Sequence, residues 1–272
     1  MTAHLPLIAD IANPQLTQAL QHKLDHKTKP LGSLGRLEQL ALRLGQIQGT
    51  ASPDLQQPQM VVFAGDHGLA ARGVSAFPSD VTWQMVENFL AGGAAVSVLA
   101  RQHGLALTVV DCGVARDIAP RAAVPGQPQL LVRKVAAGTQ DASIGPAMTP
   151  AQCAQALHNG MDVVRGLPGN ALLLGEMGIG NTSVASLLLA RLCGVSLKDC
   201  TGAGTGLDAG GVARKRAVLA QALAANEGAV NPLDALAALG GFEVATLVGA
   251  VLQASSERRV IVVDGFITSA AV

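Results

Sequence analysis

The segment GEMGIGNT at 175–182 combines glycines, a carboxylate and a helix start in a pattern suited to binding an anion. It follows the apolar run Ala171–Leu174 and leads directly into a helical pattern at Ser183–Leu192. Glycines let the backbone approach an anion closely, and a helix N-terminus supplies free N–H groups and a partial positive charge. The spacing matches neither the dinucleotide fingerprint nor a Walker loop. We therefore expect a phosphate at Gly175, Met177, Gly178, Ile179, Gly180, Asn181 and Thr182.

Each polar residue near this segment also has a plainer interpretation. Asn181 and Thr182 could cap the helix, alone or while binding phosphate. A carboxylate beside a phosphate would repel it, so Glu176 is expected to face a sugar hydroxyl or a developing ring cation, or else to be a solvated acid near the helix dipole. Lys215 could neutralise a phosphate, or could be a solvated charge like its neighbours Arg214 and Arg216.

Similar glycine-rich or acidic loops follow other apolar runs, and in open parallel sheets ligands bind beyond the carboxyl ends of the strands. The loops are therefore expected to converge on one cleft, edged by Asp66 and Asp264. The TGAGTG loop follows no clear strand and could be only a flexible turn. The loops are Gly65–Gly68, Asp111–Gly113, Thr201–Gly206 and Asp264–Phe266.

Asp66 and His67 invite comparison with a metal site. They lack companions at ligand spacing and the other five histidines are scattered, so a role in ordering loops or binding the edge of a substrate is favoured. A metal-dependent phosphatase or hydrolase built on these two residues is the least favoured alternative.

The elements that position these loops are apolar runs alternating with helical patterns, which predict an α/β protein with a mostly parallel sheet flanked by helices. The predicted strands are Met60–Ala64, Leu105–Val110, Gln129–Val135, Ala171–Leu174 and Val260–Val263. The predicted helices are Val81–Ala91, Ala151–Arg165, Ser183–Leu192, Gly211–Ala225 and Phe242–Ala254, and Asp117–Gln129 is expected to be a loop.

Residues 1–58 form a separate helical pattern without neighbouring strands. A polar helix is predicted over 14–29, followed by an amphipathic helix that starts with Ser33 as N-cap and carries Leu34, Leu37, Leu40, Ala41, Leu44 and Ile47 on one stripe. We expect 1–58 to be a small domain or a dimer contact, and 59–272 to be the α/β domain.

The composition narrows the possible partners. Lys plus Arg and Asp plus Glu number 19 each, so no net charge favours nucleic acid or an anionic membrane. The four cysteines form no C-x-x-C pair, and no apolar stretch approaches the ~20 residues of a spanning helix. A soluble, cytoplasmic protein with small-molecule substrates is expected.

At these residues the sequence resembles the nicotinate-nucleotide:dimethylbenzimidazole phosphoribosyltransferases, which make α-ribazole 5′-phosphate for the lower ligand of cobalamin. The resemblance runs in the family's order from about Lys27 to the last residue. Besides GEMGIGNT, the motifs are KPLGSLGRLE (29–38), FAGDHG (63–68), GVSAFPSDVTWQMV (73–86), GGAA (92–95), GAGTGLD (202–208), GGF (240–242) and VDGF (263–266).

The resemblance implies a Rossmann-like α/β domain with a small helical domain, assembled as a homodimer. The implied reaction moves 5-phosphoribosyl from nicotinate mononucleotide to 5,6-dimethylbenzimidazole and releases nicotinate, with no metal or cofactor. Glu176 would lie at the sugar and Lys215 near the phosphate. Gly202, Gly204, Asp264 and Gly265 would complete the ribose-phosphate site, and Asp66, His67, Phe77, Gln84 and Met85 would line the base pocket.

One feature of the family has no counterpart in the sequence. Its general base is a glutamate in a Gly-Glu-Gly-type motif on a segment beyond VDGF, and nothing in residues 1–272 matches that motif. We expect the chain to be a fragment or a truncated product with slow turnover and exposed apolar surface, in which Glu176 supports the reaction without being the base. The alternative function is non-catalytic binding of a nucleotide or base.

Overall fold

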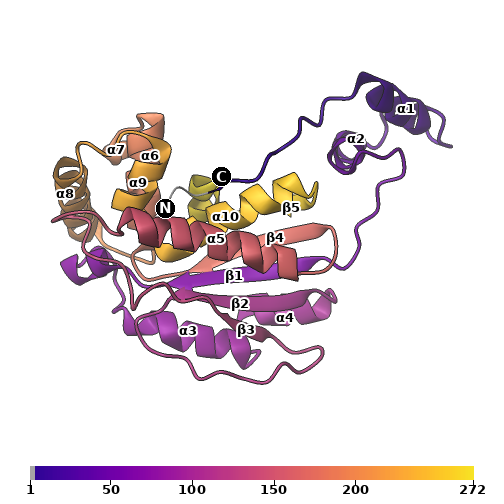
Figure 1. The fold of residues 1–272 in the computed structure, drawn as a ribbon. Helices are drawn as coiled ribbons and strands as arrows, with labels where there is room; N and C mark the ends of the chain where they lie inside the picture. Colours follow the sequence, from indigo (N-terminus) through magenta and orange to yellow (C-terminus); the bar gives the residue numbers. More distant parts are fainter. Residues whose placement is uncertain (1–3) are drawn as a thin grey trace.

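The computed structural model describes residues 4–272 and contains a five-stranded parallel sheet with strand order β3-β2-β1-β4-β5 (Figure 1). This confirms the predicted fold class and all five strands, although β3 ends earlier than expected. The strands are β1 (Gln59–Gly65), β2 (Ala106–Gly113), β3 (Gln129–Val132), β4 (Ala171–Met177) and β5 (Val260–Val262).

The sheet is covered on both faces, so its central strands are apolar throughout rather than alternating. Along β1, Val61 and Phe63 join the core beneath α5 and α10, whereas Val62 and Ala64 join the core beneath α3 and α4. The helices that follow β1 are η1 (Gly68–Arg72), α3 (Asp80–Leu90), α4 (Ala95–Gln102), α5 (Pro150–Gly166), α6 (Asn181–Cys193), α7 (Leu197–Cys200), α8 (Ala209–Ala225), α9 (Pro232–Leu239), α10 (Phe242–Ser256) and α11 (Phe266–Ala271).

Helices α5 and α10 pack closely because glycines meet backbone at their contact. A Cβ placed at Gly160 of α5 would lie 1.8 Å from the carbonyl oxygen of Thr246, and one at Gly249 of α10 would lie 2.0 Å from that of Leu157. Real Cβ atoms do not approach backbone so closely, so only glycine permits this separation. The contact fixes the height of α10 above the sheet.

The N-terminal helices α1 (Pro14–Asp25) and α2 (Arg36–Gln48) pack on each other to one side of the main body in Figure 1, and α2 contacts the edge strand β5. Ser33 is not the N-cap of α2, because a turn precedes the helix and Gly35 occupies the cap position with φ 55°. Leu37 and Leu40 of the predicted stripe are 62% and 55% exposed. The domain division at 58/59 stays a prediction.

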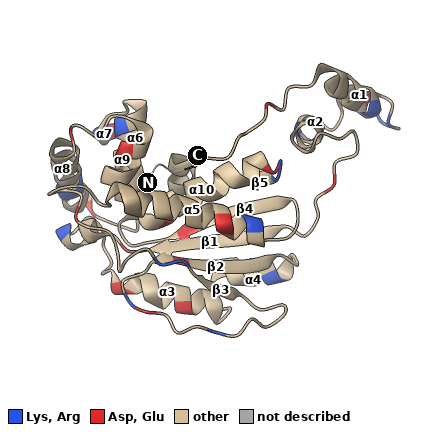
Figure 2. Ribbon diagram, in the orientation of Figure 1, with Lys and Arg blue, Asp and Glu red and all other residues tan. Residues whose placement is uncertain are grey.

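The charged residues are interspersed along the elements (Figure 2), in keeping with 19 basic and 19 acidic residues. Among residues 4–272, no helix is both long and apolar enough to cross a membrane.

Candidate active site

The predicted loops at Gly65–Gly68 and 175–182 meet between β1 and β4, where the direction of strand order in the sheet reverses. Strands β1 and β4 are neighbours, with Phe63 paired to Glu176 and Ala64 to Met177. The chain leaves β1 toward η1 and α3, on one face of the sheet, and leaves β4 directly into α6. Such a reversal opens a crevice at the carboxyl ends of the strands, which is the usual ligand site of this architecture.

The turn after β4 presents a helix start to this crevice. Gly180 has φ 99°, a left-handed conformation that suits glycine, and α6 begins at the next residue. Within residues 4–272 the N–H groups of Gly180 and Thr182 donate to no acceptor, whereas the N–H of Ile179 donates to Thr82 Oγ1 at 3.1 Å. Two amides at the positive end of a helix are thus available to an anion.

Lys215 supplies a cation to the same place. Its side chain is buried on α8, and Nζ donates to Thr182 Oγ1 at 2.8 Å. Burial lowers the pKa of Lys215 to about 8, and the described part of the chain offers its ammonium no carboxylate within salt-bridge distance. A buried ammonium without an anionic neighbour is costly, and a bound anion would remove that cost. The surface-charge interpretation of Lys215 is therefore wrong.

Glu176 lies at the end of β4, half-buried beside this helix start. Asn181 Nδ2 donates to its Oε2. Burial and the negative charge of Glu243 raise the pKa of Glu176 to about 7, while Asn181 and His67 oppose that shift. Near neutral pH this carboxyl group is therefore divided between its neutral and its ionised form.

Asp66 and His67 are buried, and one polar atom of each side chain lies close to a polar group of the protein, whereas Asp66 Oδ1 and His67 Nδ1 have no hydrogen-bond partner within residues 4–272. Asp66 Oδ2 accepts the N–H of Ala115 at 2.7 Å, and His67 Nε2 lies 2.8 Å from Glu243 Oε1. Contact of either residue with a base stays a prediction. Residues 4–272 contain no group of three or more His, Cys, Asp or Glu arranged to hold a metal ion.

The remaining predicted residues lie around these loops at different depths. Gly204 lies against the contact of Lys215 with Thr182, since a Cβ on it would be 3.3 Å from Thr182 Oγ1 and 3.5 Å from Lys215 Nζ. Gly202 begins the same exposed loop. Asp264 and Gly265 are exposed just beyond β5, at the edge of the sheet where the other loops gather.

The predicted base-pocket residues belong to α3 and the loop before it. Phe77 is 49% exposed, Gln84 is exposed, and Met85 packs with Met177 against the core beneath α3. The hydrogen bond from Ile179 to Thr82 joins α3 to the turn after β4, so α3 and the loop before it border the crevice.

Two residues of the site, Thr82 and Glu243, were not predicted from the sequence. Thr82 lies inside a quoted motif but received no role. Glu243 received no role either, yet it is fully buried and faces His67. A lone carboxylate in the apolar pattern Phe242–Ala254, directly after two glycines, could have indicated it.

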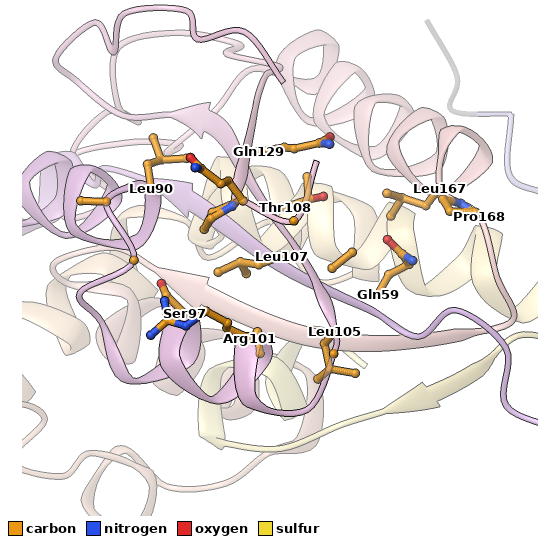
Figure 3. A pocket seen from close by; sticks show the side chains of 18 of the residues that line it. Gln59, Leu90, Ser97, Arg101, Leu105, Leu107, Thr108, Gln129, Leu167 and Pro168 are labelled. Atoms are coloured by element: carbon orange, nitrogen blue, oxygen red, sulfur yellow. The ribbon is translucent and has the colours of Figure 1, made fainter. Parts of the chain in front are cut away.

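A hollow of about 780 Å³ lies at the other edge of the sheet, at the amino ends of β1, β2 and β3 (Figure 3). Its lining includes Gln59, Leu90, Arg101, Thr108, Gln129 and Pro168. None of the predicted site residues lines it, so hollow size alone does not locate this site.

The match to a family model extends over nearly the whole chain. Residues 10–272 match the model described as Phosphoribosyltransferase. Two relatives, each named nicotinate-nucleotide–dimethylbenzimidazole phosphoribosyltransferase, come from Variovorax paradoxus and Dechloromonas aromatica. They are 70% and 55% identical over 98% and 96% of this chain, which spans 75% of each relative's length.

The solved structures agree with this match. The crystal structure of CobT from Thermus thermophilus superimposes with a TM-score of 0.86 at 40% identity, covering 95% of this chain and 77% of that one. Such identity over so much of the chain shows common descent as well as a common fold. The chain therefore belongs to the nicotinate-nucleotide–dimethylbenzimidazole phosphoribosyltransferase family.

Proposed function

We propose that this chain transfers the 5-phosphoribosyl group of nicotinate mononucleotide to 5,6-dimethylbenzimidazole, giving α-ribazole 5′-phosphate and nicotinate. The names of its relatives support this reaction. The observation that carries it is the buried ammonium of Lys215, which reaches from α8 to Thr182 at the start of α6. Only the turn at 178–180 separates the start of α6 from the strand end that carries Glu176. This arrangement offers a cation and free amides to a phosphate, and a carboxylate to the attached sugar.

The phosphate of the donor is placed between Lys215 and the start of α6. Thr182 and the N–H groups of Gly180 and Thr182 would donate to its oxygens, with Gly204 covering the site. Charge-assisted hydrogen bonds of this kind are roughly twice as strong as neutral ones. They would also fix the ribose relative to Glu176.

Glu176 is assigned to the reacting sugar. Displacement of nicotinate passes through a ribosyl group that carries positive charge, and an ionised carboxylate close to that charge lowers the barrier. The leaving pyridine is already cationic in the substrate and departs as a neutral ring without an acid. Only the ionised form of Glu176 can act in this way.

The acceptor base is placed against α3. Phe77, Gln84 and Met85 would line its pocket, with Asp66 and His67 behind it and Asp264 and Gly265 on the side of β5. An aromatic ring and a thioether suit a flat, apolar bicycle.

The test mixes the purified chain with nicotinate mononucleotide and dimethylbenzimidazole and measures released nicotinate by chromatography. We expect nicotinate release that requires dimethylbenzimidazole and that Glu176→Gln abolishes. Calorimetric binding of the nucleotide without release would support the non-catalytic alternative, and absence of both binding and release would contradict the proposal.

We also infer a homodimer that uses α2. Leu37 and Leu40 of α2 are 62% and 55% exposed, and Leu34 in the turn before α2 is 48% exposed, which forms an unusual apolar patch of three leucines. A second copy of the chain is the occupant that the resemblance implies. The cytoplasmic location stays a prediction.

A further inference from the structure

Glu243 is a carboxylate at the first turn of an apolar helix, with no exposed surface. Its Oε1 lies 2.8 Å from Nε2 of His67, whose side chain is also buried. Two side chains rarely lose all contact with water in charged form unless they pair, because an isolated buried charge is strongly destabilising. The pair joins α10 to the loop that follows β1.

Glycines surround this pair where any side chain would collide with it. A Cβ at Gly65 would lie 2.9 Å from Glu243 Oε2, and one at Gly241 would lie 2.6 Å from the same oxygen and 2.3 Å from His67 Cε1. The backbone is thus closed around both charged groups. A polar pair kept inside such a tight shell at the crevice has a specific geometry to maintain.

The phosphate-binding turn rests directly on the pair. A Cβ at Gly178 would be 3.0 Å from His67 Nε2 and 2.4 Å from the carbonyl oxygen of Gly65. Glu176, two residues earlier, is close enough to feel the charges of both Glu243 and His67. The pair therefore borders the turn that offers the amides and the carboxylate assigned to the sugar.

We propose that His67 and Glu243 are positioning residues for phosphoribosyl transfer: their buried ion pair supports the turn at Gly178 and determines how much negative charge Glu176 presents to the ribose. The inference rests on the proposed function and deepens it. Neither residue needs to touch a substrate, because both act through Glu176 and its turn.

The two members of the pair have opposite effects on the pKa of Glu176: Glu243 raises it and His67 lowers it. Glu176 is faced by Glu243 from α10, by His67 from the loop after β1, and by Asn181 from α6. Asp66 adds negative charge near His67, and the Cys112 thiol of β2 lies near Glu243 with its pKa raised by burial. Although burial alone would lower the pKa of His67, the neighbouring carboxylates raise it above its ordinary value, which favours the cationic ring.

The experiment replaces each partner with an uncharged residue of similar size. In Glu243→Gln a negative charge is lost, so the pKa of Glu176 should fall by ~1 unit. In His67→Gln a positive charge is lost, so it should rise by ~1 unit. Carbon-13 NMR of glutamate-labelled protein measures this pKa, with Glu176→Gln assigning the resonance. Thr246→Val, a buried change on the same helix, is the matched control and should leave the pKa unchanged.

Initial rates of nicotinate release, measured across pH, then test whether the pair affects the reaction. The acidic limb of the pH profile of kcat/KM should move with the Glu176 pKa, down in Glu243→Gln and up in His67→Gln. The substrate phosphate titrates identically with every variant, so it cannot produce opposite shifts. Equal acidic limbs in wild type and both folded variants would overturn the proposal.

A further variant covers the case in which a single change prevents folding. The double variant His67→Gln with Glu243→Gln leaves no unpaired buried charge, and it should fold with a Glu176 pKa closer to wild type than either single variant. Finding the Glu176 pKa unchanged in a folded single variant, or displaced further in the double variant than in a single variant, would also overturn the inference. If the wild-type chain releases no nicotinate, the proposed function fails by itself, and the NMR titration still decides whether the pair controls Glu176.

Discussion

The ammonium of Lys215 lies 2.8 Å from the hydroxyl of Thr182, although the two residues belong to different helices. This contact places a positive charge at the start of α6, at the proposed phosphate site and behind the exposed loop that contains Gly204. Because the ammonium is buried and held by Thr182, the site is preorganised for an anion, and little rearrangement should accompany binding.

Lys215→Met should therefore weaken nicotinate mononucleotide binding by about 2 kcal/mol or more, roughly thirtyfold, because the phosphate loses a desolvated charge partner. The free protein should melt at the same or a higher temperature, since an apolar side chain suits this buried position better than an unpaired cation. Calorimetry and thermal melting measure both effects. Arg214→Met removes an equal charge from the exposed side of α8 and should leave affinity unchanged; equal losses in the two variants would contradict this placement.

The pH dependence of kcat/KM should be a narrow bell. Its rising limb follows ionisation of Glu176, whose pKa is about 7, and its falling limb follows loss of the Lys215 ammonium, whose pKa is about 8. Because kcat/KM reports the free enzyme, these are the relevant values. Initial rates across neutral pH check the prediction. A falling limb that survives in Lys215→Met would show that another group causes it.

Gly178→Ala should damage the phosphate-binding turn. The new Cβ would lie 2.4 Å from the Gly65 carbonyl oxygen, so the turn must shift, at a cost of about 1–3 kcal/mol in the free energy of unfolding and with loss of nucleotide binding. Guanidinium unfolding and calorimetry measure the two losses. Gly145→Ala is the matched control, because nothing lies within 4 Å of its Cβ position. Wild-type affinity in Gly178→Ala would show that the turn does not bind phosphate.

Thr82→Val should destabilise the protein by about 1–3 kcal/mol, because the buried N–H of Ile179 loses its acceptor. Thr82→Ser keeps the hydroxyl and should retain most of the stability. Chemical unfolding curves of both variants check the expectation. A valine variant as stable as the wild type, or a serine variant less stable than the valine variant, would show that the methyl contacts of Thr82 matter more than its hydrogen bond.

Leu37→Glu with Leu40→Glu should convert the inferred dimer to a monomer, because charges would be buried in the contact between copies. Sedimentation velocity measures the change. Ile144→Glu, at a position 74% exposed elsewhere on the chain, should have no effect. A wild-type chain that sediments as a monomer at high concentration would remove the dimer from consideration.

The sheet and its longer helices could be predicted because their sequences depend on local rules. Continuous apolar runs indicate strands buried on both faces, and they predicted β1, β2 and β4 within a few residues. Helices α4 and α9 were missed because α4 is short and follows two glycines, and α9 is apolar on nearly every side. The N-cap Asn231 and Pro232 mark the start of α9 and could have indicated it.

The site could be predicted only in part. Its loops were found because strand ends and glycine patterns are local features, and the resemblance assigned Glu176 and Lys215. The pairing of His67 with Glu243 could not be predicted, since it depends on how α10 lies over β1. The same holds for Thr82, whose role depends on the position of α3 beside the turn.

The close contact of α5 with α10 allows a substitution far from the crevice to alter the site. Gly160 and Gly249 set the spacing between these helices, and α10 carries Glu243 into the site. A larger residue at Gly160 would lift α10 and draw the carboxylate away from His67. Such a variant would show an altered pKa of Glu176 without any change to a group that contacts substrate. The helix contact between α5 and α10 thus helps to determine the acid–base properties of the site.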